Sequence, residues 1–234
     1  MATDSLNAIS YSILNSLRPH ITDDFDIDIR QVKREVRKTR ALLLRNEYNK
    51  NNRVIDDDVI QNLGCVELEL ADAADCCDIQ SGCTVVKSVL PIPDTIELHE
   101  RPAITRVGPV NKIDKSYLFL DYDRVPFFGS SRFNGKEIAC FLHSDHLFLI
   151  SKDPNVKFIK YVNIRGVFED VEAVAKFTTC SGNACYTDDD KYYITDWMET
   201  YLKTIVIQQF MVTLGQPVDN TNDNKDNSVI EGQG

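Results

Sequence analysis

The chain has 234 residues, enough for one domain or two small ones with a sizeable buried core. Its formal net charge of −10 repels phosphate, which excludes general affinity for nucleic acids or anionic membranes unless a local basic surface overrides it. The composition, 43% hydrophobic and 26% charged, is typical of a soluble globular protein. No apolar run reaches the ~18–20 residues of a transmembrane helix, and the first residues lack the pattern of a signal peptide. We therefore expect synthesis in the cytoplasm and no membrane partner.

Residues 4–18, DSLNAISYSILNSLR, predict a short helix. Asp4 or Ser5 can cap its start, and Pro19 stops it. One apolar stripe recurs at helical spacing: Leu6, Ile9, Ile13 and Leu17.

Residues 28–50 predict a second helix with two different faces. Its packing stripe is formed by Ile29, Val32, Val36 and Leu43. At about 100° per residue, seven basic residues fall on the opposite side. They are Arg30, Lys33, Arg34, Arg37, Lys38, Arg40 and Arg45. With Glu35 as the single acid, residues 30–45 carry a net charge of +6, so the rest of the chain sums to −16.

Three interpretations of this basic face are open. It can be a solvated surface, as most charge runs are. It can contact duplex DNA, where Lys and Arg neutralise phosphates without reading sequence. It can also contact acidic segments of a neighbouring copy, which would fix the register of self-association. We prefer the third interpretation, because the rest of this acidic chain would repel DNA outside a narrow geometry.

The pattern changes to a β-rich region over residues 54–168. VELEL (66–70) alternates apolar and acidic residues as a half-buried strand does. TVVKSVLPIPDTIEL (84–98) is broken by two prolines, which suits edge strands and turns. Residues 116–168 predict a β-meander, whose apolar runs are separated by the turn formers FNGK, HSDH and KDPN.

Residues 195–215 predict a third helix, capped by Thr195 and ended by Gly215 and Pro217. It is apolar around much of its circumference, so we expect burial against other helices or a neighbouring subunit. The residues expected to pack there are Trp197, Met198, Tyr201, Leu202, Ile205 and Phe210. The remaining segment, 216–234, is polar, and we expect it to be flexible when alone.

No catalytic constellation or phosphate-binding glycine loop is present in the sequence. Seven cysteines without an export signal favour reduced thiols. A zinc site using CSGNAC (180–185) lacks a second spaced pair of ligands. His143 and His146 in HSDH fit a tight turn between two strands better than a metal site. We therefore predict no metal, no cofactor and no enzymatic activity.

The order of these segments resembles the ring-forming structural proteins of tailed bacteriophages, and most closely the head-to-tail connector proteins of crAss-like phages. The resemblance lies in the N-terminal helix pair, the basic segment VKREVRKTRALLLRNEYNKN, VLPIPDTIEL and WMETYLKTIVIQQFMVTLGQPVDNTND. It implies a virion protein that forms a twelvefold homo-oligomeric ring between the portal and another tail ring, with genomic double-stranded DNA passing through its channel. It also implies that the terminal segment 216–234 orders on docking.

We expect an α+β fold in which residues 1–53 and 169–215 form a helical body around a β-rich region, 54–168. The sequence leaves open whether the β-rich region is an inserted domain or marks a ring lower in the same tail. A cytoplasmic DNA-binding or regulatory protein that uses helix 28–50 is the alternative function. A metal-dependent enzyme using His143, His146 and cysteines is a third and weaker possibility.

Overall fold

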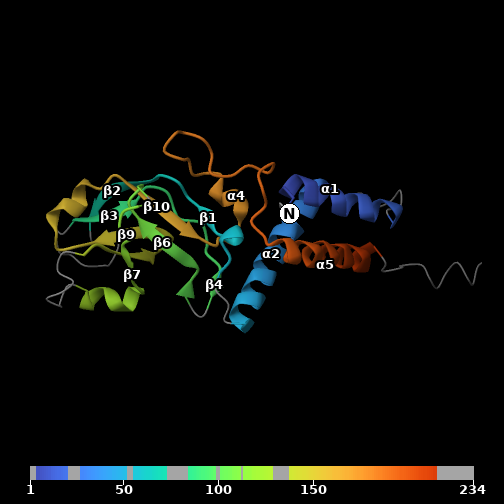
Figure 1. The fold of residues 1–234 in the computed structure, drawn as a ribbon, viewed down its shortest axis with the longest axis horizontal. Helices are drawn as coiled ribbons and strands as arrows, with labels where there is room; N and C mark the ends of the chain where they lie inside the picture. Colours follow the sequence, from blue (N-terminus) through green and yellow to red (C-terminus); the bar gives the residue numbers. More distant parts are fainter. Residues whose placement is uncertain are drawn as a thin grey trace, which may run out of the picture.

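The structure is a computed structural model that describes residues 4–20, 27–51, 55–72, 84–98, 101–111, 113–128 and 137–214. It is a mixed α and β fold, with a curled sheet at one end and three helices at the other (Figure 1). The helices are α1 (Leu6–Leu17), α2 (Ile29–Asn51), α4 (Val171–Val174) and α5 (Asp196–Leu214). Short 3-10 turns are η1 (Arg18–His20), η2 (Asp57–Val59), η3 (Tyr122–Phe127) and η4 (Pro154–Phe158).

The strands are β1 (Gln61–Asn62), β2 (Val66–Asp72), β3 (Thr84–Ser88), β4 (Glu97–Leu98), β5 (Arg101–Pro102), β6 (Ile104–Gly108), β7 (Leu118–Phe119), β8 (Ala139–His143), β9 (His146–Ile150) and β10 (Tyr161–Gly166).

The three long helices lie where the sequence predicts them. Ser5 caps α1, because its side-chain oxygen accepts a hydrogen bond from the Ala8 N–H at 3.2 Å. The predicted stripe of α1 is fully buried. Helix α5 begins at Asp196, and the expected stop at Gly215 and Pro217 lies outside the described residues.

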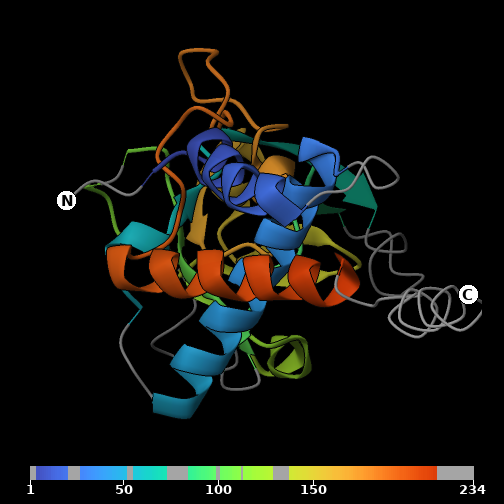
Figure 2. The same ribbon diagram turned by 90° about the vertical axis from the view of Figure 1, so that its right-hand side faces the viewer.

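Helix α2 runs from the helical end of the molecule towards the sheet and crosses behind α5 (Figure 2). Its 23 residues span about 34 Å at 1.5 Å per residue. The first half buries Val32 and Val36, and the second half buries Leu44 and Tyr48. Because α2 contacts α1, α5 and strand β4, it is the element shared by both ends of the fold.

The large sheet has the strand order β1-β10-β2-β3-β9-β8-β7, and β6, which lies off this path, also pairs with β10. The meander prediction is therefore right for two of its four segments, β8 and β9, and wrong for the other two, β7 and β10. Among these four segments, only β8 and β9 form a sequential hairpin. Strand β7 pairs in parallel with β8, and β10 pairs with β1, β2 and β6 instead of β9. Turn signals indicate where two strands that are consecutive in the sequence are joined by a short connection. They do not indicate which strands far apart in the sequence pair with each other, because tertiary packing selects those partners.

Strand β3 is also interior, since it pairs with β2 on one side and β9 on the other. The prediction of an edge strand at this position is wrong. Pro91 and Pro93 do not contradict the interior position, because both residues follow the end of the strand and remove no donor from its ladder.

The β8–β9 hairpin turns at Ser144 and Asp145, as the HSDH pattern predicts. Both residues have positive φ, 46° and 63°. Two positive φ values are the signature of a type I′ turn, which matches the right-handed twist of the flanking strands. Below the turn, the side-chain hydroxyl of buried Ser88 accepts from the Leu147 N–H at 3.1 Å, and His146 contacts the Ser88 carbonyl through Nδ1 at 2.8 Å. The His146 side chain thus helps to hold the hairpin against the end of β3.

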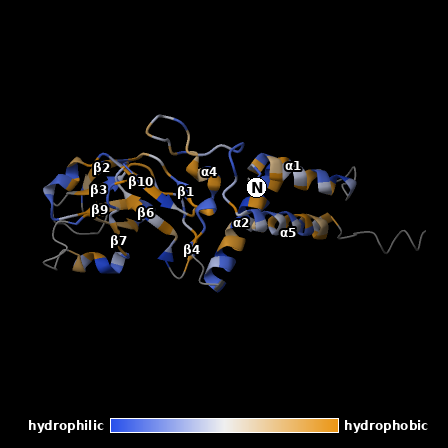
Figure 3. Cartoon of the chain, viewed as in Figure 1, coloured by the Kyte–Doolittle hydropathy of each residue, from blue (hydrophilic) through white to orange (hydrophobic). Residues whose placement is uncertain are grey.

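Buried side chains of the helices and the large sheet form a contiguous hydrophobic cluster. Hydrophobic residues are concentrated in the strands, whereas hydrophobic and hydrophilic residues alternate along α2 (Figure 3). The boundaries at residues 53 and 168 stay predictions, and segment 216–234 lies outside the described residues.

The segment 177–195, here called the strap, leads from α4 to α5 and contacts both ends of the fold. At its start the Cys65 N–H donates to the Thr178 carbonyl at 3.0 Å, and a disulfide joins Cys65 to Cys180. This pair is therefore oxidised in the structure, whereas the sequence favours reduced thiols; only the folded chain brings the two cysteines together. Cys140 and Cys185 are free, and Cys76, Cys77 and Cys83 lie outside the described residues.

We predict that Asp145→Gly stabilises the protein. Glycine adopts positive φ without the steric cost that an L side chain meets, so the free energy of unfolding should rise by roughly 0.5–1 kcal/mol. The measurement is equilibrium unfolding in urea. Asp153→Gly is the matched control: Asp153 has φ −76°, and its carboxylate accepts the Asn155 N–H. This control should lose stability, and equal losses in both variants would contradict the prediction.

Candidate subunit interface

Arg40 is fully buried, which contradicts its expected place on an exposed basic face. Its Nε donates to the Tyr193 carbonyl at 2.6 Å, and one terminal nitrogen donates to the Phe168 carbonyl at 2.9 Å. The guanidinium also lies over the ring of Tyr192, 5.7 Å from its centroid. Burial lowers the pKa of Arg40, an effect that the surrounding tyrosines oppose. Arg40 therefore joins α2 to the end of the sheet and to the strap.

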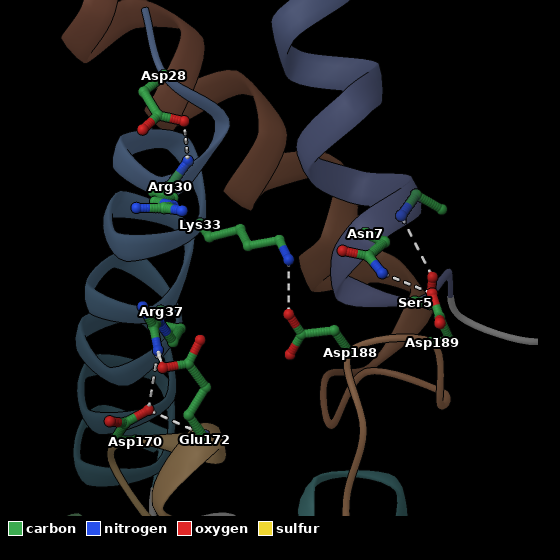
Figure 4. A network of polar contacts seen from close by, with 11 residues as sticks. Ser5, Asn7, Asp28, Arg30, Lys33, Arg37, Asp170, Glu172, Asp188 and Asp189 are labelled. Carbon is green, nitrogen blue, oxygen red and sulfur yellow. Dashed lines mark hydrogen bonds and ion pairs between the residues drawn. The ribbon is translucent and has the colours of Figure 1, made fainter.

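Lys33 and Arg37 are also engaged within the chain (Figure 4). Lys33 pairs with Asp188 of the strap at 2.6 Å. Arg37 pairs with Asp170 at 3.5 Å and with Glu172 of α4. Partial burial alone would lower the pKa of Arg37, but the hydrogen bond and charge of Glu172 raise it. Three of the seven predicted cations thus hold the fold together.

The other four basic residues are exposed and form what we call the basic strip: Arg30, Arg34, Lys38 and Arg45. The division follows the helix geometry. At about 100° per residue, Arg40, Lys33 and Arg37 lie nearest the apolar stripe, and the basic strip lies farther round. The angle between each basic residue and the apolar stripe can be calculated from the sequence, and it separates the cations engaged within the chain from the exposed basic strip.

The basic strip borders a groove of about 610 Å³. Exposed Leu42 lies between the cations on the α2 side. The opposite side is acidic and is formed by Glu169, Asp170 and Glu172. Such a groove offers charge-assisted hydrogen bonds to carboxylates on one side and repels them on the other, so it would orient an approaching partner.

The six α5 residues expected to pack divide into three levels of burial. Met198 and Leu202 are fully buried, while Ile205 and Phe210 are half-buried. Trp197 and Tyr201 remain 44% and 62% exposed, with their rings edge to face at 6.3 Å. This exposed aromatic pair borders a second groove, of about 380 Å³, against Leu43 and Lys50 of α2. The molecule thus presents an apolar surface where α2 and α5 cross.

Within the described ranges, no group of three or more His, Cys, Asp or Glu side chains could hold a metal ion. His143 stacks on Tyr122, with ring centroids 4.6 Å apart, at the end of the hairpin. None of the helices in the described part of the chain combines the length and apolar character needed to span a bilayer.

Exposed charged and apolar surfaces on a shared core are typical of a protein that contacts other macromolecules. The sequence matches the family of phage tail ring protein 2 (CrAss_Ring_2) over residues 8–228, and the chain belongs to this family of crAss-like phages. The resemblance to ring-forming phage structural proteins is confirmed. The protein is thus a structural component of the virion tail that works in an oligomeric ring. No curated protein matches the sequence.

We predict that Arg40→Ala costs about 3 kcal/mol or more of unfolding free energy. The change removes the guanidinium and leaves the Tyr193 and Phe168 carbonyls without these donors inside the protein. Arg34→Ala, at a side chain 69% exposed, is the matched control and should change stability by less than ~0.5 kcal/mol. Denaturant titration of both variants measures the difference. Similar small losses would show that the buried contacts of Arg40 do not support the fold.

Proposed function

We propose that this tail ring protein forms the ring that joins the portal to the tail and lets the genomic DNA pass. In this arrangement a twelvefold ring of identical chains contacts the portal above and another tail ring protein below. Membership in the tail ring family supports the proposal at the level of the class. The acidic composition of the chain suits a channel that does not retain DNA, because attractive walls would slow the passage of the genome.

The observation that carries the proposed assembly is that the seven basic residues of α2 form two groups, three engaged within the chain and four exposed. A closed ring of identical subunits joins two different patches of the same protein. The basic strip is one such patch, since its four cations are exposed while the rest of the chain is strongly acidic. We propose that it contacts acidic side chains of the adjacent subunit and sets the rotation between copies.

DNA is the alternative partner of the basic strip. Phosphates would meet the same cations, but they would also meet Glu169, Asp170 and Glu172 across the groove. Repulsion between phosphates and these carboxylates disfavours DNA. It favours a protein partner, which can place acidic and apolar side chains against the basic strip and Leu42 and keep its acidic groups away from the carboxylates. The exposed Trp197 and Tyr201 fit a protein partner as well, since aromatic residues are enriched in such interfaces.

We predict that the double charge reversal Arg34→Glu/Arg45→Glu prevents ring assembly without unfolding the chain. Incorporation into particles, measured by quantitative peptide mass spectrometry, should fall at least ~10-fold, because close charge pairs at interfaces contribute strongly to association. Lys157→Glu/Lys160→Glu makes the same charge change at exposed residues of the sheet end and serves as the control. Normal incorporation of the first variant would exclude the basic strip from the subunit contact. Steeply salt-dependent duplex binding by the wild type, lost in that variant, would support the DNA alternative.

We further predict that Trp197→Ala/Tyr201→Ala reduces incorporation by a similar factor, because removing large aromatic side chains from an interface costs more than removing most others. The control is Tyr11→Ala, which truncates an exposed aromatic side chain on α1. Stability of the isolated chain should change little in either variant. Equal incorporation of both would show that the aromatic pair faces solvent in the ring.

The position of the ring is tested by its copy number. Peptide mass spectrometry of purified particles should detect this chain at the copy number of the portal protein, and imaging of the particles should place it next to the portal. A clearly different ratio would contradict the joining role while leaving family membership intact.

A further inference from the structure

The Cys65–Cys180 disulfide connects the sheet end of the molecule to the strap. Cys65 lies in the turn between β1 and β2, and Cys180 lies near the start of the strap, 115 residues later. Their Cα atoms are 5.2 Å apart, within the range that a disulfide spans without backbone movement. The two sulfur atoms therefore meet because of the fold, at positions that the sequence gives no reason to pair.

Non-covalent contacts of the backbone also bring the turn and the strap together. Gly64 has φ +58°, and a Cβ at this position would lie 2.6 Å from the Thr178 carbonyl oxygen and 3.0 Å from the Thr179 Cα. Only glycine allows the turn and the strap to come so close. The Cys65 N–H also donates to the Thr178 carbonyl. The reduced chain can thus adopt the same arrangement, with both thiols already in place.

The pair is accessible to small reagents. Cys180 is exposed and Cys65 is half-buried, whereas Cys140 is fully buried. Burial raises the pKa of Cys140 to about 12, and it also raises the pKa of Cys185. Since the thiolate is the reactive form, these two cysteines are poor nucleophiles near neutral pH. Among the four described cysteines, oxidation is therefore directed to Cys65 and Cys180.

We propose that Cys65 and Cys180 are a site of oxidative modification that stays a dithiol while the chain folds and assembles in the reducing cytoplasm, and closes to a disulfide in the released particle. The proposal rests on membership in the virion tail and not on where the ring lies. The cytoplasm keeps thiols reduced, while disulfides persist in oxidising surroundings. The cross-link then fixes the strap to the sheet after assembly is complete.

The oxidant is a low-molecular-weight disulfide. One protein thiolate attacks it, forms a mixed disulfide and releases one small thiol. The second protein thiolate then attacks the protein sulfur and releases the second small thiol. Two protein thiols lose two protons and two electrons in total, and the small disulfide takes them up as two thiols.

The structural consequence follows from the other contacts of the strap. Asp188 pairs with Lys33 of α2, Asp189 accepts from the Asn7 side chain of α1 at 2.5 Å, and Lys191 pairs with Asp58 at 2.8 Å. These contacts are non-covalent and reversible. Closing the disulfide adds a constraint to the unfolded chain, so it should make the assembled tail more resistant to unfolding.

The test compares the thiol state inside cells with that in particles. Infected cells are lysed in excess N-ethylmaleimide, purified particles are treated in the same way, and peptides are mapped without reduction. We expect both thiols to be alkylated in the cells and a Cys65–Cys180 peptide pair in the particles. The same state in both samples, or pairing of Cys180 with another cysteine such as Cys185, would overturn the proposal.

A second measurement uses the purified full-length chain. The oxidised wild type should unfold about 5–10 °C higher than the same protein in dithiothreitol. Cys65→Ser/Cys180→Ser should show no such difference and should match the reduced wild type, whereas Cys185→Ser should keep the full difference. Loss of the difference in Cys185→Ser would assign the cross-link to another pair, and a double variant less stable than the reduced wild type would show that the thiols support the fold by packing.

Discussion

The buried guanidinium of Arg40 is the constraint on which the arrangement of the two ends depends. A charged group removed from water is tolerated only where its hydrogen bonds are replaced. Here the replacements are the carbonyls of Phe168, which follows the last strand, and Tyr193, which precedes α5. Arg40 makes both of these hydrogen bonds only when the sheet and the strap approach helix α2 together. One side chain thus sets the relative position of three segments that are far apart in the sequence.

Helix α2 therefore has two roles, which belong to different sides of the helix. The cations nearest its apolar stripe bind the strap and α4, and the cations farther round remain exposed beside Leu42. The internal pairs orient α2, so the exposed cations are presented from a fixed scaffold instead of a loose helix. A rigid presentation matters for a ring, because small angular errors between subunits accumulate around the closed circle. The fold and the proposed contact are therefore coupled through the same helix.

Local sequence patterns were reliable where a single element carried the information. The spacing of Leu6, Ile9 and Ile13 predicts α1 and its buried face, and the HSDH turn predicts the β8–β9 hairpin. They were unreliable for contacts between distant segments. The pairing of β3 with both β2 and β9, and the exposure of Trp197 and Tyr201 beside the buried Met198, follow from which elements pack together. Periodicity describes one helix or strand and carries no information on its neighbours.

By itself, the sequence determined the three long helices, the β-rich region between them, the concentration of positive charge on α2 and the resemblance to phage ring proteins. Each of these depends on residues close together in the chain, whose spacing fixes a face or a turn. Tertiary structure alone decided which groups Lys33, Arg37 and Arg40 contact, and that Cys65 meets Cys180. These outcomes depend on approaches between residues more than a hundred positions apart, which only the common packing of sheet, strap and helices can bring about.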